Sequence, residues 1–434
     1  MIEQRLSSPV FFGNFQFRLR GRQRRTLGSH GSLAALILLT LASAGNASAQ
    51  QAADHWLNSY LAKAETANAL KVAQAAMIRE PDGQQQRFDL GVIQTLTAIE
   101  DFGQELYRMG LRKRPANVPS PPWLQLPLPD NPAPERATYA RLKAAITKLH
   151  GQLEEAEQTL QRVTDPGVAI PLAFGQLALD LNGDGRASSS ERLPEVFRNV
   201  SGETRNRRLD EVVVRFDLAD AIWLRGYCHL ALAGCDFMLA WDWSEAFEAS
   251  GDTFFAGGTK LPQGELLSMM ANRFLLIHRL EAPLREPARL ESARRHLLSA
   301  LQLSQQMWKA IEAETDDNRE WIAGPKQTHQ WGPQGVDQAM IDAWQELMKE
   351  LEATLEGRKR IPFWRSLPNA PTPVGLNLAK FVKQPPEVFD ALQWFQGSAA
   401  IEYLEPGELL SPSVWEPLQK RLGDRFGRFV IWVN

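Results

Sequence analysis

The feature that most constrains the fold of this 434-residue chain is a helical repeat of apolar residues between positions 136 and 163. The repeat advances by alternating steps of four and three, through Leu142, Ile146, Leu149, Leu153, Ala156, Leu160 and Val163. Side chains at this spacing lie on one face of an α-helix, so the segment predicts a long helix packed against others. Burying such a stripe favours a mostly α, multi-helix, bundle-like architecture.

Other segments extend this prediction. Helical patterns occur over residues 55–79, 89–110, 217–247, 262–279, 287–315 and 334–355, with a further helix near 388–395. Residues 217–247 are apolar on all sides, which is typical of a central buried helix. A Pro-rich stretch at 115–135 cannot be helical and predicts an extended crossing segment. The composition of 212–216 and 426–434 favours strands, so we expect a small C-terminal strand-containing segment.

Residues 180–191 read Asp-Leu-Asn-Gly-Asp-Gly-Arg-Ala-Ser-Ser-Ser-Glu and predict a calcium site. Ca²⁺ takes six to eight oxygen ligands, which alternate side chains of a tight turn can supply. Gly185, at the sixth position, permits the sharp reversal that the turn needs. The expected ligands are Asp180, Asn182, Asp184, the backbone carbonyl of Arg186, Ser188 and Glu191.

This dodecapeptide resembles the calcium loop of the EF-hand family, D-x-[DN]-x-[DN]-G-x5-E. The resemblance implies a helix on each side of the loop, and the flanking residues place them over 172–179 and 191–200. Ala187 stands where paired loops carry a larger apolar residue, and the sequence has no second such stretch. A lone, weak and structural ion is therefore expected, with a solvated turn as the alternative. The remainder of the chain resembles exported bacterial helical proteins, which implies no activity.

Residues 1–49 have the features of an export signal. Five arginines between positions 18 and 25 precede the apolar run 33–44, and Ala47-Ser48-Ala49 offers small residues for cleavage. The run is shorter than the roughly 20 residues that a membrane-spanning helix needs. We expect a bacterial periplasmic or secreted protein that is not an integral membrane protein after cleavage, with an uncleaved anchor as the alternative.

The remaining chain is moderately acidic. Without the signal's six Arg and one Glu, 42 basic and 50 acidic residues remain, which argues against a nucleic-acid partner. Its length suits one or two domains, and we divide it into 50–200 and 201–434. Cys228 and Cys235 lie about 10 Å apart on one expected helix, too far for a disulfide, and are expected to be buried thiols.

One face of the central helix carries three ionisable residues, Arg225, His229 and Asp236. Such groups on an apolar helix are costly unless they are paired. They predict either a polar cleft, in which His229 acts as an acid, a base or a ligand contact, or an internal charge network that fixes helix packing.

A second cluster lies at residues 314–321, where four carboxylates occur among eight residues. His329 follows after a short loop. The cluster could supply an acid–base pair, with Asp316, Asp317 or His329 as the reacting groups, or it could be a solvated helix end.

The sequence lacks the H-E-x-x-H, G-x-S-x-G, P-loop and G-x-G-x-x-G motifs of common enzymes. It therefore favours an exported calcium-binding protein that acts as a binding or structural module of the cell envelope. The alternative is a secreted or periplasmic hydrolase that uses the 314–329 cluster. A pocket joining the 225–236 stripe to that cluster would favour the enzyme.

Overall fold

The computed structural model describes residues 55–112, 126, 128–195, 212–258, 280–328, 336–365, 373–411, 413 and 415–422. Several sequence predictions lie outside these ranges. They are the export signal, nearly all of the Pro-rich stretch before residue 126, the helix over 262–279, His329 and the strand over 426–434.

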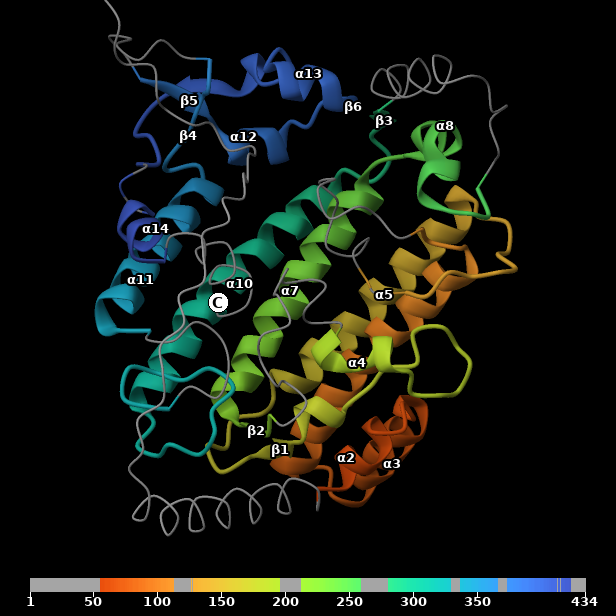
Figure 1. Cartoon of the computed structure of the whole chain (residues 1–434). Helices are drawn as coiled ribbons and strands as arrows, with labels where there is room; N and C mark the ends of the chain where they lie inside the picture. Colours follow the sequence, from red (N-terminus) through yellow and green to blue (C-terminus); the bar gives the residue numbers. More distant parts are fainter. Residues whose placement is uncertain are drawn as a thin grey trace, which may run out of the picture.

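Four long helices form the centre of the described fold (Figure 1). They are α4 (Gln84–Arg108), α5 (Tyr139–Leu160), α7 (Leu218–Ala240) and α10 (Ala288–Ala313). Each packs mainly on its neighbours in chain order, α4 on α5, α5 on α7 and α7 on α10. Neighbours run antiparallel (Figure 1); Gly91 near the start of α4, for example, meets Leu160 at the end of α5. The described fold is therefore mostly helical, as the periodicity predicts.

Shorter helices flank this row. α2 (Trp56–Leu61) and α3 (Thr66–Arg79) lie beside α4, and α11 (Gln338–Leu355) lies on α10 with α14 (Glu416–Leu422) against it. α8 (Ser244–Phe254) follows α7. The central helices are thus covered on both sides by elements from the two ends of the described chain (Figure 1).

The strands are short and antiparallel. β1 (Ile170–Leu172) pairs with β2 (Val214–Phe216), and β3 (Glu281–Pro283) pairs with β6 (Val388–Asp390). A three-stranded sheet contains β4 (Ile361–Pro362), β5 (Val374–Leu376) and β7 (Leu404–Pro406), with β5 in the middle. Together with α12 (Leu378–Lys383) and α13 (Ala391–Gln396), this sheet and β6 form a C-terminal part that contains both strands and helices.

Local chemistry explains where the two best-defined helices begin. The Thr138 side chain accepts a hydrogen bond from the Arg141 backbone N–H at 3.3 Å and caps α5. Asp217 caps α7 in the same way, accepting from the Ala219 N–H at 2.8 Å. In α5 the predicted stripe is the buried face, with Leu153 and Leu160 almost wholly shielded.

Three helix predictions away from the loop 180–191 needed correction. The segment 55–79 breaks into α2 and α3, because Ala64 takes a left-handed φ of 58° between them. The helix predicted over 217–247 ends at Ala240, where the wholly buried Trp241 turns extended and bridges to Leu284. The helix predicted near 388–395 is strand β6 followed by α13.

The two cysteines behave as predicted. Cys228 and Cys235 are both unbonded and buried on α7. Burial raises the pKa of each thiol to about 12. Because thiolates are the reactive form of cysteine, these thiols are shielded chemically as well as sterically.

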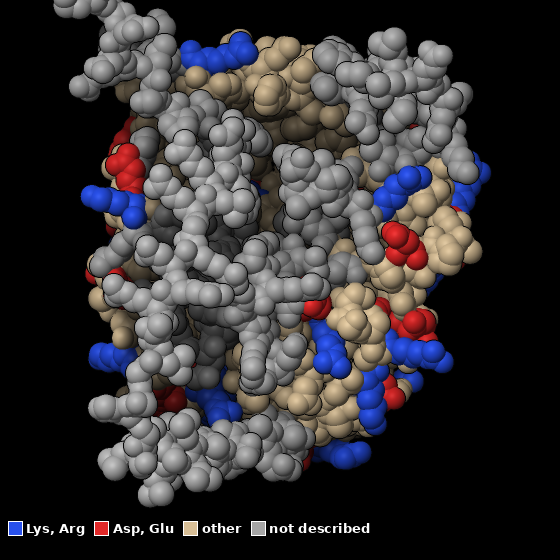
Figure 2. All heavy atoms as spheres, viewed as in Figure 1, with Lys and Arg blue, Asp and Glu red and all other residues tan. Residues whose placement is uncertain are grey.

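The described surface carries charges of both signs. On the face in Figure 2, basic and acidic side chains are interspersed over the described helices. Among the described residues, no helix combines the length and the apolar run that crossing a membrane requires.

The contact between α4 and α5 predicts opposite effects for two glycine substitutions. A Cβ on Gly91 would lie 2.5 Å from the buried Leu160 side chain, so Gly91→Ala should destabilise the protein by about 1–3 kcal/mol. Gly151, exposed on α5, has nothing within 4 Å of its Cβ position. Gly151→Ala should stabilise the protein by about 0.5–1 kcal/mol through helix propensity. Urea unfolding measures both, and equal effects would contradict the close packing.

Candidate functional site

The segment 180–191 folds as a closed loop on a narrow neck. Ala178 and Arg192 are antiparallel bridge partners on its two sides. The Leu179 N–H donates to the Glu191 carbonyl at 3.0 Å, and the Leu193 N–H donates to the Leu177 carbonyl at 2.8 Å. The ends of the loop are thus fixed next to each other by the backbone.

The prediction of a helix over 172–179 is wrong. This stretch contains the last residue of β1, the 3₁₀ turn Phe174–Gln176 and then extended chain. The reason is backbone pairing, first of β1 with β2 and then of 177–178 with 192–193, which a helix cannot make. Ser189–Glu191 form a 3₁₀ turn at the end of the loop, and residues 193–195 after it are helical. The rest of the predicted helix 191–200 lies outside the described residues.

Asp180 organises the first half of the loop. Its Oδ1 accepts from the Gly183 and Asp184 N–H groups at 2.7 and 3.0 Å, and its Oδ2 accepts from the Gly185 N–H at 2.9 Å. Gly183 and Gly185 have φ of 76° and 74°, left-handed values that glycine adopts at no steric cost. Both glycines of the loop therefore have a direct conformational role.

Glu191 closes the loop from its other end. Its side chain is wholly buried, and Oε1 accepts from the Leu181 and Asn182 N–H groups at 3.0 and 3.1 Å. Oε2 accepts from the Ser188 N–H at 3.1 Å. The carboxylates at positions one and twelve thus both turn inward on the loop backbone, which brings the first and last predicted ligands into one small structure.

The other predicted ligands lie nearer the surface. Asp184 Oδ1 accepts from the Arg186 N–H at 2.9 Å, and Asp184 Oδ2 accepts from Asn182 Nδ2 at 3.2 Å. The Ser188 hydroxyl lies 3.0 Å from that of Ser190. Oxygen donors from five of the six predicted residues are therefore side chains around one turn, which fits a hard cation in donor type.

Two side chains of α4 hold the start of the loop. Glu100 Oε2 accepts from the Asp180 N–H at 2.7 Å, and Gln104 Nε2 donates to the Asp180 carbonyl at 2.8 Å. Burial raises the pKa of Glu100 to about 7, against the hydrogen bonds from Thr66 and Asp180 that favour ionisation. The loop is thus anchored to the central helices at its first residue.

A second carboxylate group, the acidic triad, consists of Asp217, Glu314 and Glu320. One carboxylate oxygen from each lies within 4.8 Å of the others, a separation at which three ligands can share a metal ion. Asp217 begins α7 and Glu314 ends α10, so the antiparallel packing of these helices brings them together. Glu320 follows in a loop that joins β2 through the Arg215 N–H, which donates to the Arg319 carbonyl at 3.0 Å.

The carboxyl groups of the triad are poorly solvated, and this disfavours their charged forms. Burial raises the pKa of Glu314 to about 7, and the nearby Asp217 adds to the effect. Burial likewise raises the pKa of Glu320 to about 7. Asp220, one turn into α7, is buried beside them and has a pKa well above its ordinary value. The group therefore favours protons or a cation over free negative charge.

Of the three residues predicted for hydrolase chemistry, only Asp316 borders the acidic triad. Asp316 lies at its edge, with Oδ2 3.9 Å from Arg215 Nη1. Asp317 instead accepts from the backbone N–H and the hydroxyl of Thr328, both at 2.6 Å, and so fixes the loop. His329 lies outside the described residues.

The predicted stripe on α7 makes contacts between helices. Arg225 Nε donates to Glu157 Oε1 of α5 at 3.0 Å, and His229 Nε2 lies 3.5 Å from the same oxygen. Burial works against ionisation of Glu157, but these two partners outweigh it and lower its pKa. The stripe therefore joins α7 to α5 electrostatically.

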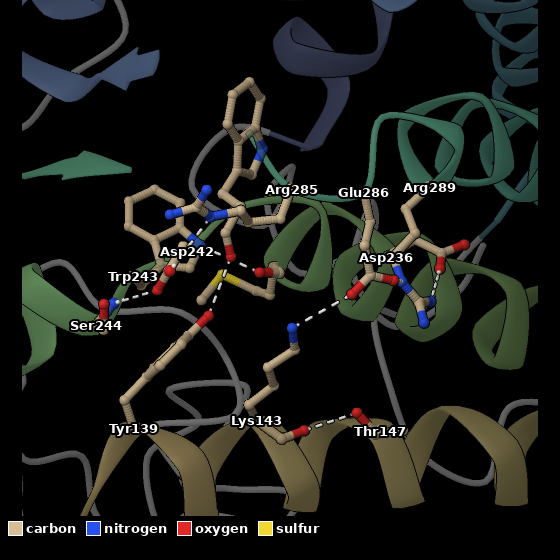
Figure 3. Close-up of polar contacts among 12 residues, drawn as sticks. Tyr139, Lys143, Thr147, Asp236, Asp242, Trp243, Ser244, Arg285, Glu286 and Arg289 are labelled. Carbon is tan, nitrogen blue, oxygen red and sulfur yellow. Dashed lines mark hydrogen bonds and ion pairs between the residues drawn. The ribbon is translucent and has the colours of Figure 1, made fainter. Parts of the chain in front are cut away.

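Asp236, the third stripe residue, faces the start of α10. Figure 3 shows Arg289 directed at both Asp236 and Glu286, with Lys143 of α5 reaching Glu286 from the other side. Arg289 Nη1 donates to Asp236 Oδ1 at 2.8 Å and Arg289 Nε donates to Glu286 Oε2 at 2.6 Å. Asp236 is almost wholly buried, so this pairing is what permits its charge.

The stripe and the acidic triad do not share a described pocket. An apolar pocket of about 170 Å³ lies between α7, α10 and α11. Its lining includes Trp223, Met307 and Trp344, and none of the stripe or triad residues.

Sequence reasoning placed Glu314 and Glu320 in one acidic cluster but missed Asp217 as their partner, and it missed His150 and His296 as neighbours of the stripe. The capping position of Asp217 could be read from the sequence, because Asp precedes the apolar helix by one residue. The two histidines lie on other helices, and only the packing of α5, α7 and α10 brings them close.

No protein-family model, curated protein or solved structure matches this chain. The functional proposals therefore depend on the residues and geometry described above.

The acidic triad predicts a fall in stability with rising pH. In the folded protein Glu320 keeps its proton up to about pH 7, whereas its ordinary pKa is 4.5. The stability that protonated Glu320 contributes is fully present below pH 4.5 and is lost as the pH rises to about 7. Glu320→Gln removes the ionisation and should raise stability at pH 8, relative to pH 5, by about 1–3 kcal/mol. Urea unfolding in EDTA at both pH values measures this.

The matched control is Glu346→Gln, because the Glu346 side chain is exposed on α11. Its effect should be nearly the same at both pH values. If the wild type and Glu320→Gln follow the same pH profile, Glu320 does not titrate as described.

Proposed function

We propose that this chain is an exported protein that binds one Ca²⁺ in the loop 180–191, where the ion has a structural role. The ligands would be Asp180, Asn182, Asp184, the Arg186 carbonyl, Ser188 and Glu191. The observation that carries the proposal is the position of the Asp180 carboxylate, which draws in the amides of residues 183–185 and curls the turn around its own oxygens.

The donor chemistry supports calcium over other ions. All the proposed ligands are oxygens, which hard cations prefer, and the loop contains no His or Cys. Three carboxylates and a single loop suit the roughly 10⁻⁴–10⁻³ M affinity of extracellular calcium modules. The export signal expected from residues 1–49 would deliver the protein to such a compartment.

The surroundings of the loop support a structural role. The Ala178 N–H donates to the Leu61 carbonyl of α2 at 2.9 Å, and Glu100 and Gln104 of α4 hold Asp180. An ion bound to Asp180 would strengthen a junction that already joins α2, α4 and the loop. On this basis the protein acts as a binding or structural module of the cell envelope.

The alternative proposal is a hydrolase, and one observation favours it. Glu314 and Glu320 have pKa values of about 7, which suit proton transfer near neutral pH. Glu320 is only 3 % exposed, however, and the described apolar pocket does not include it. Substrate access to these carboxyls is therefore less well supported than ion binding in the exposed loop 180–191.

Calcium should raise the melting temperature of the protein. With 1 mM Ca²⁺ and a dissociation constant of about 10⁻⁴–10⁻³ M, binding stabilises the folded state by about 0.4–1.4 kcal/mol. This corresponds to roughly 0.5–2 °C for a chain of this size. Thermal unfolding in EDTA and in Ca²⁺ measures the shift, and its absence in the wild type would sink the proposal.

Two variants locate the ion. Asp180→Ala/Glu191→Ala should abolish the shift, although it also removes six backbone contacts within the loop. Asp184→Ala is the milder test, because Asp184 is exposed and its loss leaves the neck intact. The matched control is Asp165→Ala, which alters a similar turn at Gly167 and should leave the calcium response unchanged.

A further inference from the structure

Three histidines meet where α5, α7 and α10 pack together. His150 comes from α5, His229 from α7 and His296 from α10. The rings of His229 and His296 have centroids 5.1 Å apart, and those of His150 and His296 lie 6.3 Å apart. We call these residues, with Asp236 and Glu154, the histidine cluster.

The cluster already has the spacing of a metal site. One ligand atom each from His150, Glu154 and His296 lies within 4.8 Å of the other two. Asp236 borders the same space, with Oδ1 3.2 Å from His150 Nε2 and Oδ2 3.8 Å from His296 Nε2. Ligands of one Zn²⁺ lie about 2.0–2.2 Å from the ion and hence about 3–4 Å from one another.

Two polar atoms of the cluster have no well-aligned hydrogen bond. His150 Nε2 and Asp236 Oδ2 are both shielded from solvent and make no hydrogen bond within the described residues. Asp236 as a whole is 1 % exposed. A buried nitrogen and a buried carboxylate oxygen without well-aligned hydrogen bonds are costly, and a shared cation would satisfy both.

The hydrogen bonds around His296 fit a ligand role. Its Nδ1 lies 2.8 Å from His229 Nδ1, and His229 Nε2 faces Glu157. If His296 Nδ1–H donates to His229, then His229 carries its own proton on Nε2, toward the Glu157 carboxylate. His296 Nε2, which faces Asp236, is then deprotonated as a metal ligand requires. Such an outer chain of histidine and carboxylate commonly orients metal-binding imidazoles.

Charge and access agree with this assignment. Arg289 occupies Asp236 Oδ1 and leaves Oδ2 toward the histidines. The Glu154 side chain is 47 % exposed, so the cluster opens to solvent on that side.

From these contacts we infer that the histidine cluster is a binding site for a first-row divalent transition-metal ion such as Zn²⁺. His150, Glu154 and His296 hold the ion, Asp236 completes the donor set and His229 orients His296. Mixed imidazole and carboxylate donors suit such ions and not Ca²⁺, so this site is chemically distinct from the loop 180–191. It would tie together the three helices at the centre of the fold.

The test is a Co²⁺ titration of the purified full-length protein, stripped with EDTA and then saturated with Ca²⁺ to fill the loop. We expect one Co²⁺ per chain, reported by visible absorption and displaced by Zn²⁺. His150→Gln/His296→Gln should weaken binding at least 100-fold, and His229→Gln should weaken it about 10–100-fold, as for other outer residues of metal sites. A wild type that binds no more tightly than the double variant overturns the inference.

The matched control is His55→Gln. His55 is also a shielded histidine beside a carboxylate, with Nε2 3.7 Å from Asp89 Oδ1, but it lies outside the cluster. His55→Gln should bind Co²⁺ as tightly as the wild type does. A loss of affinity equal to that of His150→Gln/His296→Gln would overturn the assignment. Should the double variant fail to fold, X-ray absorption of the zinc-loaded wild type decides the matter. Two imidazole ligands are expected, and a spectrum without imidazole overturns the inference.

Discussion

The antiparallel packing of α7 between α5 and α10 is the contact on which the rest of the structure depends. α7 is apolar around most of its circumference, so both neighbours can bury against it over its full length. Antiparallel packing also sets opposite helix ends side by side. The start of α7 therefore meets the end of α10 at the acidic triad, and the later turns of α7 meet the start of α10 and the middle of α5 at the histidine cluster.

The ionisable residues along α7 show how such a helix can remain in an apolar core. Arg225 pairs with Glu157, and Asp236 pairs with Arg289. Breaking one partner of a buried pair costs several kcal/mol, so these contacts disfavour any other register of the three helices. The triad is different, because its members carry the same charge and are accommodated through protons or a cation.

Much of the helical architecture could be predicted from the sequence because apolar periodicity is a local signal. The stripe of α5 is the clearest case, and its predicted face is the buried one. Local signals failed where tertiary contacts decide, as in the strand pairing that replaces the helix over 172–179. The same limit applies to the sites. The loop 180–191 is contiguous and could be read position by position, whereas His150 and His296 are 146 residues apart and meet only after three helices have packed.

The narrow neck of the loop 180–191 has a consequence for how this part of the protein can change. Since the bridge between Ala178 and Arg192 returns the chain to the place it left, the thirteen residues between them form a hairpin, and its exposed residues 183–187 are an excursion outside the helical framework. Insertions or deletions within that excursion would leave the packing of α5 and α7 unchanged, because the chain enters and leaves the loop at the same place. The segment can accordingly diversify in evolution, or be exchanged for another hairpin by an engineer, while the helices keep their register.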